Sequence, residues 1–303
     1  MTPPSAGDPT GTWPPDDAPP ILPQRTEAPP IPPLRTDAPP LAILVDFDGT
    51  IALTDVGDAI MAAHVPGDWR AEDAAWEAGL LGSRHLMEDE VALMPPDPDA
   101  LLATAAAQPL DPGFTRLVHR ARALGVPIEV VSDGFGFFIA PALERLGVPD
   151  VRVVTARFRF GPEGRPTISW PNGDPACFVC GTCKRDRVLA HRAAGRRVVF
   201  VGDGASDRYA AAYSDVVFAK RSLVRICEEN GWPWLGWIVL DDVTAWLEVA
   251  VEAWRVDPAS LPPASPKQLI CGAEVWGPGR TDPPAPGPSP APGPSLEPGR
   301  THP

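Results

Sequence analysis

Two aspartates that follow an apolar run give the first indication of chemistry in this chain. Residues Leu41–Val45 are uninterruptedly apolar, and the next five residues, 46–50, read Asp-Phe-Asp-Gly-Thr. Alternation along an extended chain points Asp46 and Asp48 the same way, and two close carboxylates repel unless a divalent cation compensates them. One carboxylate could then attack phosphorus while the other protonates the leaving oxygen. In isolation, the motif could equally be a turn that closes a loop.

Three further polar groups follow in the chain. Ser132-Asp133-Gly134 offers a hydroxyl and loop amides that can hydrogen-bond a phosphoryl oxygen. Lys184 could neutralise phosphate and a nucleophilic carboxylate together. Asp203 and Asp207 are four residues apart, so that a short turn can bring both to one cation. Each group alone is an ordinary turn or surface lysine, but the four together predict a phosphoryl-transfer site.

The elements that must position these groups form an alternating pattern. Apolar runs typical of buried parallel strands precede most of the polar motifs, and helical patterns lie between them. Such alternation predicts a Rossmann-like α/β fold, with a parallel sheet covered on both sides and ligands bound beyond the carboxyl ends of its strands. The predicted strands are Leu41–Val45, Val126–Val131, Arg197–Val201, Val216–Phe218 and Trp237–Leu240, and the helices are Phe114–Leu124, Ala140–Leu146 and Arg185–Ala194.

The first two predicted strands are separated by about seventy residues, far more than one crossover helix needs. Helical patterns in this stretch predict a small α-helical cap inserted at about 56–110 of a core domain that spans 41–255. The expected helices are Val56–Ala63, Ala71–Ala78, Ser83–Met94 and Asp97–Gln108.

Both ends of the chain are rich in proline. About two thirds of the 42 prolines lie before Leu41 or after Trp254, and residues 17–41 repeat an Ala-Pro-Pro motif every ten residues. Proline cannot continue a helix and this composition cannot bury a core, so we expect 1–40 and 256–303 to be disordered. They are either solvated spacers or ligands for a proline-recognising partner.

The overall charge disfavours two classes of partner. With a formal net charge of −13, the chain should repel nucleic-acid phosphates and anionic membranes. The N-terminus lacks a signal-peptide pattern, and the apolar run around Trp232–Leu240 is too short to span a bilayer. Five cysteines without a signal peptide indicate reduced thiols and a cytoplasmic location.

Cys177, Cys180 and Cys183 have the spacing of part of a zinc or iron–sulfur site. His191 or Cys227 would have to supply the fourth ligand. A disulfide and plain reduced thiols remain alternatives.

The ordered set of motifs resembles the phosphatases of the haloacid dehalogenase superfamily over residues 41–250. These enzymes show DxDGT, then Ser or Thr, then Lys, then GDxxxD. The resemblance implies a Mg²⁺-dependent phosphatase that acts on a small phosphorylated metabolite, with Asp46 as the nucleophile and Asp48 as the general acid and base. It further implies a phosphate-binding set (Thr50, Ser132, Asp133, Gly134 and Lys184) and a magnesium-binding set (Asp46, the carbonyl of Asp48, Asp203 and Asp207).

The inserted helices resemble the cap of the phosphoserine phosphatase-like branch. Asp55 lies where that branch carries an acidic substrate-contacting residue, although it could equally cap a helix. Asp55, Trp69, the segment from Trp76 to Gly79, and the Cys180–Lys184 motif also resemble the methionine-salvage phosphatases of 2-hydroxy-3-keto-5-methylthiopentenyl-1-phosphate. Two alternative functions remain, namely a phosphotransferase and a non-catalytic binding protein that uses its proline-rich ends.

Overall fold

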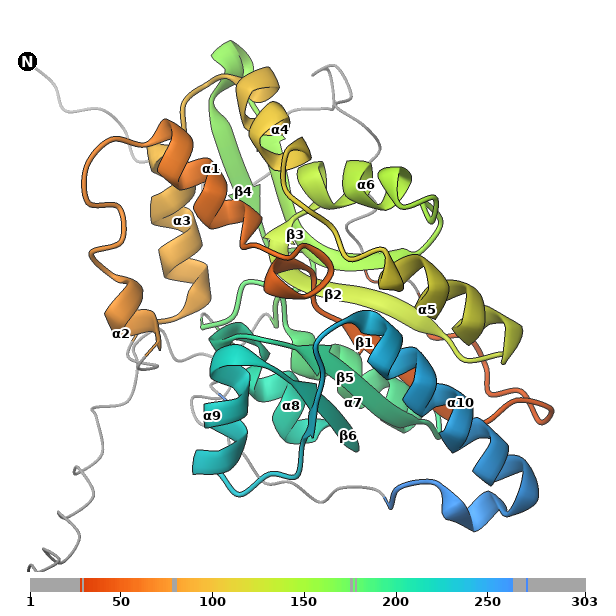
Figure 1. Ribbon diagram of the computed structural model, residues 1–303. Helices are drawn as coiled ribbons and strands as arrows, with labels where there is room; N and C mark the ends of the chain where they lie inside the picture. The colour runs from red at the N-terminus through yellow and green to blue at the C-terminus, as the bar shows by residue number, and fades with distance from the viewer. Residues whose placement is uncertain are drawn as a thin grey trace, which may run out of the picture.

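The fold is built on one seven-stranded sheet. The computed structural model describes residues 28, 30–77, 81–174, 177, 179–263 and 271. The sheet order is β4-β3-β2-β1-β5-β6-β7 (Figure 1), and every neighbouring pair is parallel except the antiparallel β3–β4 pair. The prediction of a Rossmann-like α/β fold is therefore confirmed. The strands are β1 Leu41–Val45, β2 Ile128–Phe135, β3 Arg152–Phe160, β4 Pro166–Ser169, β5 Arg197–Gly202, β6 Val216–Ala219 and β7 Leu235–Gly236.

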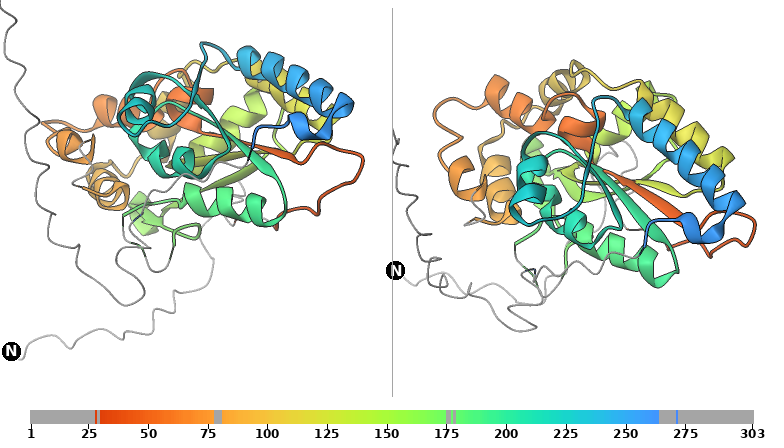
Figure 2. Two further views of the ribbon diagram at one scale, coloured as in Figure 1. Left: turned by 90° about the horizontal axis from the view of Figure 1, so that it is seen from below. Right: turned by 60° about the horizontal axis from the view of Figure 1, so that its bottom comes forward.

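Alternation along β1 divides the core into two layers. Ile43 and Val45 belong to the larger cluster of buried side chains, which includes those of helices α5 (Gly113–Ala123), α6 (Gly136–Arg145) and α10 (Leu240–Val256). Leu44 points to the opposite face of the sheet. There, helices α7, α8 and α9 supply the second cluster, and the left view of Figure 2 shows α5 and α10 on one side of the sheet with α7 on the other. These three helices span Lys184–Ala193, Arg208–Tyr213 and Arg221–Glu229.

The direction in which the sheet is wound determines where ligands can bind. From β1 the chain proceeds to β2 and β3 with helices on one face, and from β5 it proceeds to β6 and β7 with helices on the other. Right-handed crossovers require this change of face when the direction of winding reverses. The reversal lies between β1 and β5, so a crevice is expected beyond the carboxyl ends of these two strands.

Four helices between β1 and α5 lie over one end of the sheet, and we call them the inserted helices. They are α1 (Val56–His64), α2 (Asp73–Glu77), α3 (Ser83–Leu93) and α4 (Pro98–Ala106), and Figure 1 shows α1–α3 grouped to one side of the strands. Asp55 and Asp97 cap α1 and α4 by accepting the amides of Asp58 and Ala100. All four helices agree with prediction within a few residues. Gly79 of the Trp76–Gly79 motif lies outside the described residues.

The last predicted strand was wrong. The strand here is Leu235–Gly236, whereas Leu240 already begins α10. Asp242 accepts hydrogen bonds from the amides of Ile238 and Val239, and acidic side chains in a first turn favour a helix start. Core packing of Trp232 and Trp237 is confirmed, because their side chains are buried. The pattern also missed β3, whose second half alternates arginine with phenylalanine, and β4, which is only four residues long.

The described part of the N-terminal proline-rich segment lies on the core. Arg196 Nη2 donates to the carbonyls of Pro32 and Pro33 at 2.8 and 2.9 Å, and Ala38 is buried. At the other end, a short 3-10 helix, Pro258–Ser260, follows α10. The expectation of disorder therefore does not hold for these parts, because core side chains bond carbonyls that proline leaves available. Among the described residues, no helix is both long and apolar enough to cross a bilayer.

Candidate active site

Asp46 and Lys184 form a buried ion pair at the carboxyl end of β1. Lys184 Nζ, from the first residue of α7, lies 2.8 Å from Asp46 Oδ1 and 2.7 Å from Asp207 Oδ1. Burial and the charge of Asp207 raise the pKa of Asp46 well above its usual range, and Lys184 opposes that shift. Burial disfavours the charge on Lys184, but Asp207 and Asp46 outweigh it and raise the lysine pKa. Lys184 therefore stays charged and favours the ionised form of Asp46, which burial and the charge of Asp207 oppose.

The loop after β5 brings in Asp203 and Asp207. Asp207 Oδ2 accepts the amides of Asp203 and Gly204 at 2.9 and 3.1 Å, so this side chain shapes the loop from within. Arg221 Nη1 donates to Asp203 Oδ2 at 3.0 Å. Burial and the charge of Asp207 nevertheless raise the pKa of Asp203 to about 6.

Three of these carboxylates meet the chemical requirements of a divalent cation. Asp46, Asp203 and Asp207 are buried, and one oxygen from each lies within 4.8 Å of the others. Burial first, and the charge of Asp207 second, raise the pKa values of Asp46 and Asp203 even though Lys184 and Arg221 oppose the shifts. Carboxylate oxygens are the ligands that Mg²⁺ prefers, and a divalent cation would relieve this repulsion. The residues therefore fit a magnesium ion.

Asp48 lies beside these three carboxylates, and its side chain has a different set of neighbours. Its Oδ1 accepts the amide of Val56 at 2.9 Å. Burial and the charge of Asp55 raise the pKa of Asp48 well above its usual range, which favours the protonated form. A group of this kind can carry a proton to a leaving oxygen.

Two glycines allow the loops to approach one another. Gly49 has a φ of +66°, and a Cβ there would lie 2.1 Å from Asp203 Oδ2. At Gly134, a Cβ would lie 2.4 Å from Asp48 Oδ2. Neither position has room for a side chain, so the glycines of the first two motifs are required by close contact.

The loop at the end of β2 is held by its own side chains. Ser132 Oγ accepts the amide of Gly134 at 2.9 Å, and Asp133 Oδ1 accepts the amide of Thr182 at 2.8 Å. The carboxylate of Asp133 thus connects this loop to the segment that precedes Lys184. Thr50 is fully buried, and among the described residues its hydroxyl oxygen has no hydrogen-bond partner, so its predicted role in phosphate binding stays a prediction.

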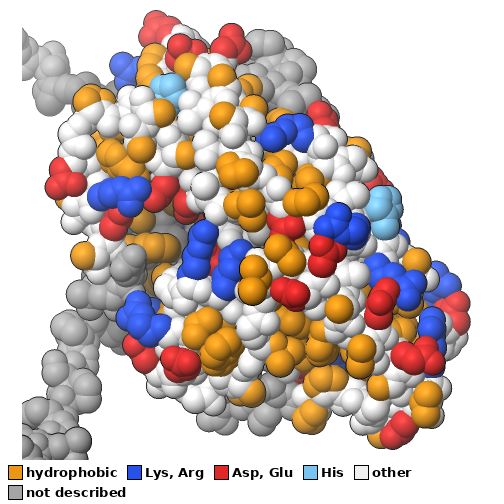
Figure 3. Space-filling model, viewed as in Figure 1, with side chains coloured by type: hydrophobic (Ala, Val, Ile, Leu, Met, Phe, Trp, Pro, Cys, Tyr) orange, Lys and Arg blue, Asp and Glu red, His pale blue; other side chains and the backbone are white. Residues whose placement is uncertain are grey.

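A cavity of about 290 Å³ lies between these loops and the inserted helices. In Figure 3, basic and acidic side chains gather around a hollow at this position. Asp55 both caps α1 and lines the cavity, so its two interpretations are compatible. Besides Gly57 and Ser83, the other lining residues that the inserted helices and their connections contribute are apolar (Trp76, Leu86 and Met87) or charged (Asp58, Arg70, Asp73 and Glu90).

Arg221 and Glu90 are cavity residues that the sequence analysis missed. Lys220 and Arg221 come immediately after the carboxyl end of β6. Because ligands bind beyond the carboxyl ends of parallel strands, this position could have identified Arg221 from the sequence. Its φ of +49° is unusual for a residue with a side chain, and its Nη2 also bonds the carbonyl of Leu53. Burial and the charge of Asp55 raise the pKa of Glu90 to about 8. Nothing in the local sequence marks Glu90, because its environment comes from distant segments.

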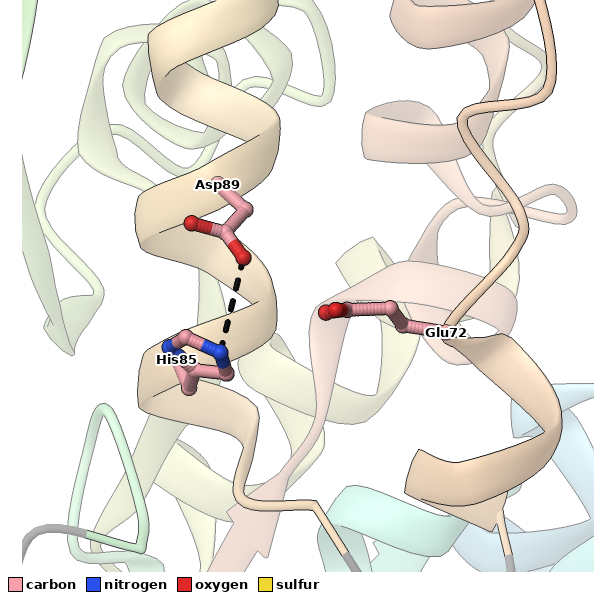
Figure 4. Close-up of side chains that lie close together, drawn as sticks. All are labelled: Glu72, His85 and Asp89. Atoms are coloured by element: carbon pink, nitrogen blue, oxygen red, sulfur yellow. Dashed lines mark ion pairs between the residues drawn. The ribbon is translucent and has the colours of Figure 1, made fainter.

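A second group of possible metal ligands lies on the inserted helices. Figure 4 shows Glu72 facing His85 and Asp89 of α3, and His85 pairs with Asp89 at 3.5 Å. The side chains of His85 and Asp89 are more than half exposed, and we assign no ligand to this group.

Comparison with known proteins agrees with this geometry. A family model for haloacid dehalogenase-like hydrolases matches residues 43–212. A 2-hydroxy-3-keto-5-methylthiopentenyl-1-phosphate phosphatase of Geobacillus thermodenitrificans is 32% identical over 221 residues, covering 69% of this chain and 96% of that protein. Its counterpart in Geobacillus kaustophilus is 34% identical over 206 residues, covering 64% and 89%.

Solved structures share the fold. A phosphoserine phosphatase determined as a phospho-aspartyl intermediate analogue has a TM-score of 0.54 at 18% identity, covering 69% of this chain and 99% of its own. A substrate-bound phosphoserine phosphatase has the same TM-score at 17% identity, with 70% and 99% covered. The chain therefore belongs to the haloacid dehalogenase-like hydrolases, with the fold of their phosphoserine phosphatase-like branch, and is a phosphoric monoester hydrolase.

Proposed function

We propose that the chain is a Mg²⁺-dependent phosphatase that hydrolyses a small phosphate monoester through an aspartyl-phosphate on Asp46. The observation that carries the proposal is the buried carboxylate of Asp46 at the end of β1, 2.8 Å from Lys184 Nζ and close to Asp203. Lys184 favours the ionised form of Asp46, which is the form that attacks phosphorus. Uncatalysed hydrolysis of such esters is among the slowest reactions known, so a preorganised charged site of this kind is required.

The proton transfers are assigned to Asp48. Its raised pKa keeps a proton on the carboxyl group, which is donated to the ester oxygen as the P–O bond breaks. The resulting carboxylate then accepts a proton from the water that attacks the aspartyl-phosphate, and Asp46 is released with inorganic phosphate. Ser132 and the loop amides at Asp133 and Gly134 would bind the phosphoryl oxygens, the Gly134 amide by exchanging its hydrogen bond to Ser132 Oγ for one to the phosphoryl group, whereas the carboxylate of Asp133 would position the loop.

Asp46, Asp203 and the backbone carbonyl of Asp48 would hold the magnesium ion. Both oxygens of Asp207 already bond Lys184 and two backbone amides, so we assign Asp207 to positioning rather than to direct coordination. The ion supplies positive charge that neutralises the phosphate and lowers the repulsion against the attacking carboxylate.

We further propose that residues at about 56–110 act as a cap on the 41–255 core and select the substrate. The cavity is of a size for a small metabolite, and the inserted helices give it both apolar and charged walls. The named relatives make 2-hydroxy-3-keto-5-methylthiopentenyl-1-phosphate the first substrate to test, with Trp76 and Met87 available for its apolar end. The acidic residues with Arg70 make phosphoserine the second, with Asp55 as a contact.

The test is phosphate release from a panel of these two compounds, sugar phosphates, phosphocholine and nucleotides, with magnesium or with chelator. We expect magnesium-dependent release that Asp46→Asn abolishes while the fold is kept. Asp48→Asn should slow turnover most for esters with poor leaving groups, because these depend on protonation. Magnesium-independent release, or substantial turnover by Asp46→Asn, would contradict the mechanism.

A further inference from the structure

The two sides of the active-site cavity differ in charge. On the core side, Arg221 pairs with Asp203 at 3.0 Å and Arg225 pairs with Glu229 at 3.6 Å. On the side of the inserted helices, four carboxyl groups line the cavity together with one guanidinium, and these belong to Asp55, Asp58, Asp73, Glu90 and Arg70. Among the described lining residues, the inserted helices and their connections therefore contribute an excess of acidic groups.

Arg70 is in contact with its own neighbours on several sides. Its Nη2 donates to Asp58 Oδ2 at 2.7 Å, its Nη1 lies 3.7 Å from Asp73 Oδ2, and its Cζ lies 4.3 Å from the centroid of the Trp69 ring. The side chain of Arg70 is 54% exposed, and ion pairs as exposed as these contribute little stability one by one. What matters for a ligand is the sum of the charges, because two carboxylates around one guanidinium leave no net positive charge there.

Glu90 responds to the same excess of negative charge. Burial is the largest cause that raises its pKa to about 8, and the charges of Asp55, Asp58 and Asp73 come next. Arg70 opposes the shift but does not cancel it. A protonated Glu90 can donate a hydrogen bond to an uncharged oxygen of a ligand, whereas a carboxylate on the ligand would meet the same repulsion that keeps Glu90 protonated.

We propose that this wall selects phosphate monoesters that carry no carboxylate, and that Asp58 and Asp73 set the selection by balancing the charge of Arg70. This selection rests on the proposed phosphatase function of the same cavity. Lys184 and a bound magnesium ion would balance the phosphate, but a second anion at the wall of inserted helices would meet more carboxyl groups than cations. Like charges placed side by side discriminate strongly against a ligand. Esters that end in a hydroxyl, carbonyl or amino group fit the wall, and phosphoserine should be a poor substrate.

The test compares two pairs of esters that differ in a carboxylate. Phosphoethanolamine lacks only the carboxylate of O-phosphoserine, and glycerol 3-phosphate has a hydroxymethyl group where 3-phosphoglycerate has a carboxylate. Phosphate release is measured with magnesium at pH 7, where Glu90 is mainly protonated. We expect kcat/KM to be higher for the carboxylate-free member of each pair by about tenfold or more, because like-charge contact is costly.

Replacing both balancing carboxylates should weaken the selection. In Asp58→Asn/Asp73→Asn the charge of Arg70 is no longer balanced, so kcat/KM for the two carboxylate esters should rise and the ratio within each pair should fall by about tenfold. Adding Arg70→Gln to that variant should lower kcat/KM for the carboxylate esters again. The matched control is Asp89→Asn/Asp99→Asn, which removes the same charge from α3 and α4 outside the cavity and should leave both ratios unchanged.

A wild type that does not prefer the carboxylate-free member of both pairs would overturn the proposal. Ratios that Asp58→Asn/Asp73→Asn leaves unchanged, or that the control variant shifts as much, would do the same.

Binding of the four esters to Asp46→Asn with magnesium, measured by calorimetry, separates this selection from the phosphatase assignment. Tighter binding of the carboxylate-free esters, without phosphate release by the wild type, would support the selection and contradict the phosphatase mechanism. Turnover combined with the opposite order of binding would contradict the selection alone. Neither binding nor release of phosphate from any of the four esters would contradict both.

Discussion

Replacing Asp203 by asparagine should stabilise the metal-free protein while it abolishes activity. Burial and the charge of Asp207 raise the pKa of Asp203 from 3.8 to about 6. Each pKa unit corresponds to 1.36 kcal/mol, so the ionised side chain costs about 3 kcal/mol of folding free energy at pH 8. Asparagine removes the charge and can still accept the hydrogen bond from Arg221 Nη1.

The pH dependence and the response to magnesium follow from the same shift. The folded-state pKa of Asp203 lies above the unfolded value, so the penalty is absent below pH 3.8 and complete above about pH 6. In chelator at pH 8, Asp203→Asn should therefore melt about 6–12 °C above the wild type, given about 2–4 °C per kcal/mol for a domain of this size. Magnesium should stabilise the wild type, by about 2.7 kcal/mol at 100 times its Kd, and leave the variant unchanged.

Thermal unfolding with and without magnesium measures all of these values. Asp111→Asn is the matched control, because Asp111 is buried away from the site and accepts the amides of Gly113 and Leu240. That variant should be destabilised by about 1–3 kcal/mol whether or not magnesium is present. If Asp203→Asn melts below the wild type in chelator at pH 8, the idea of uncompensated repulsion in the carboxylate cluster is refuted.

Three other substitutions test separate parts of the structure. Gly49→Ala should lose most of kcat, because its Cβ would lie 2.1 Å from Asp203 Oδ2; a variant with wild-type kcat would show that the loops can separate. Glu129→Gln should lower the free energy of unfolding in urea by about 3 kcal/mol at pH 7, an effect that fades as the pH falls from 4.5 toward 2. Burial opposes ionisation of Glu129, but hydrogen bonds from His191 and Arg187 outweigh it and hold its pKa at about 2, so an effect that persists at pH 2 would count against this cause. Glu90→Gln should match the wild-type KM at pH 7 and diverge from it above about pH 8, where Glu90 ionises; a difference already present at pH 7 would contradict the raised pKa.

Sequence patterns predicted most of the sheet and of the candidate site. The apolar runs at Leu41–Val45 and Arg197–Val201 match β1 and β5 closely, because strands buried on both faces need uninterrupted apolar residues. The motifs that follow these strands meet at one edge, as parallel strands require. Prediction failed at Trp237–Leu240, where an apolar run precedes a helix, and at β3, where alternation with arginines conceals the strand. It also failed at β4, which has only four residues and one aliphatic side chain, Ile168.

What the sequence determined by itself is the residue types of the candidate site and their order along the chain. Asp46 and Asp48 follow a buried strand, and Lys184 and Asp203 occur at positions where an α/β fold brings them to the same edge. The direction of each of these side chains is local information, since it follows from the strand or helix that carries the residue.

Only the tertiary structure decided the protonation states and the contacts between distant segments. The raised pKa values of Asp48 and Glu90 arise from burial and from Asp55, which the fold places beside them. Likewise, only the fold brings Cys271 and Cys183, which lie 88 positions apart in the sequence (271 − 183), to the wall of the same small cavity. The physical reason is that desolvation and Coulomb energies depend on distance in space and on the surrounding atoms, neither of which a residue's position in the sequence contains.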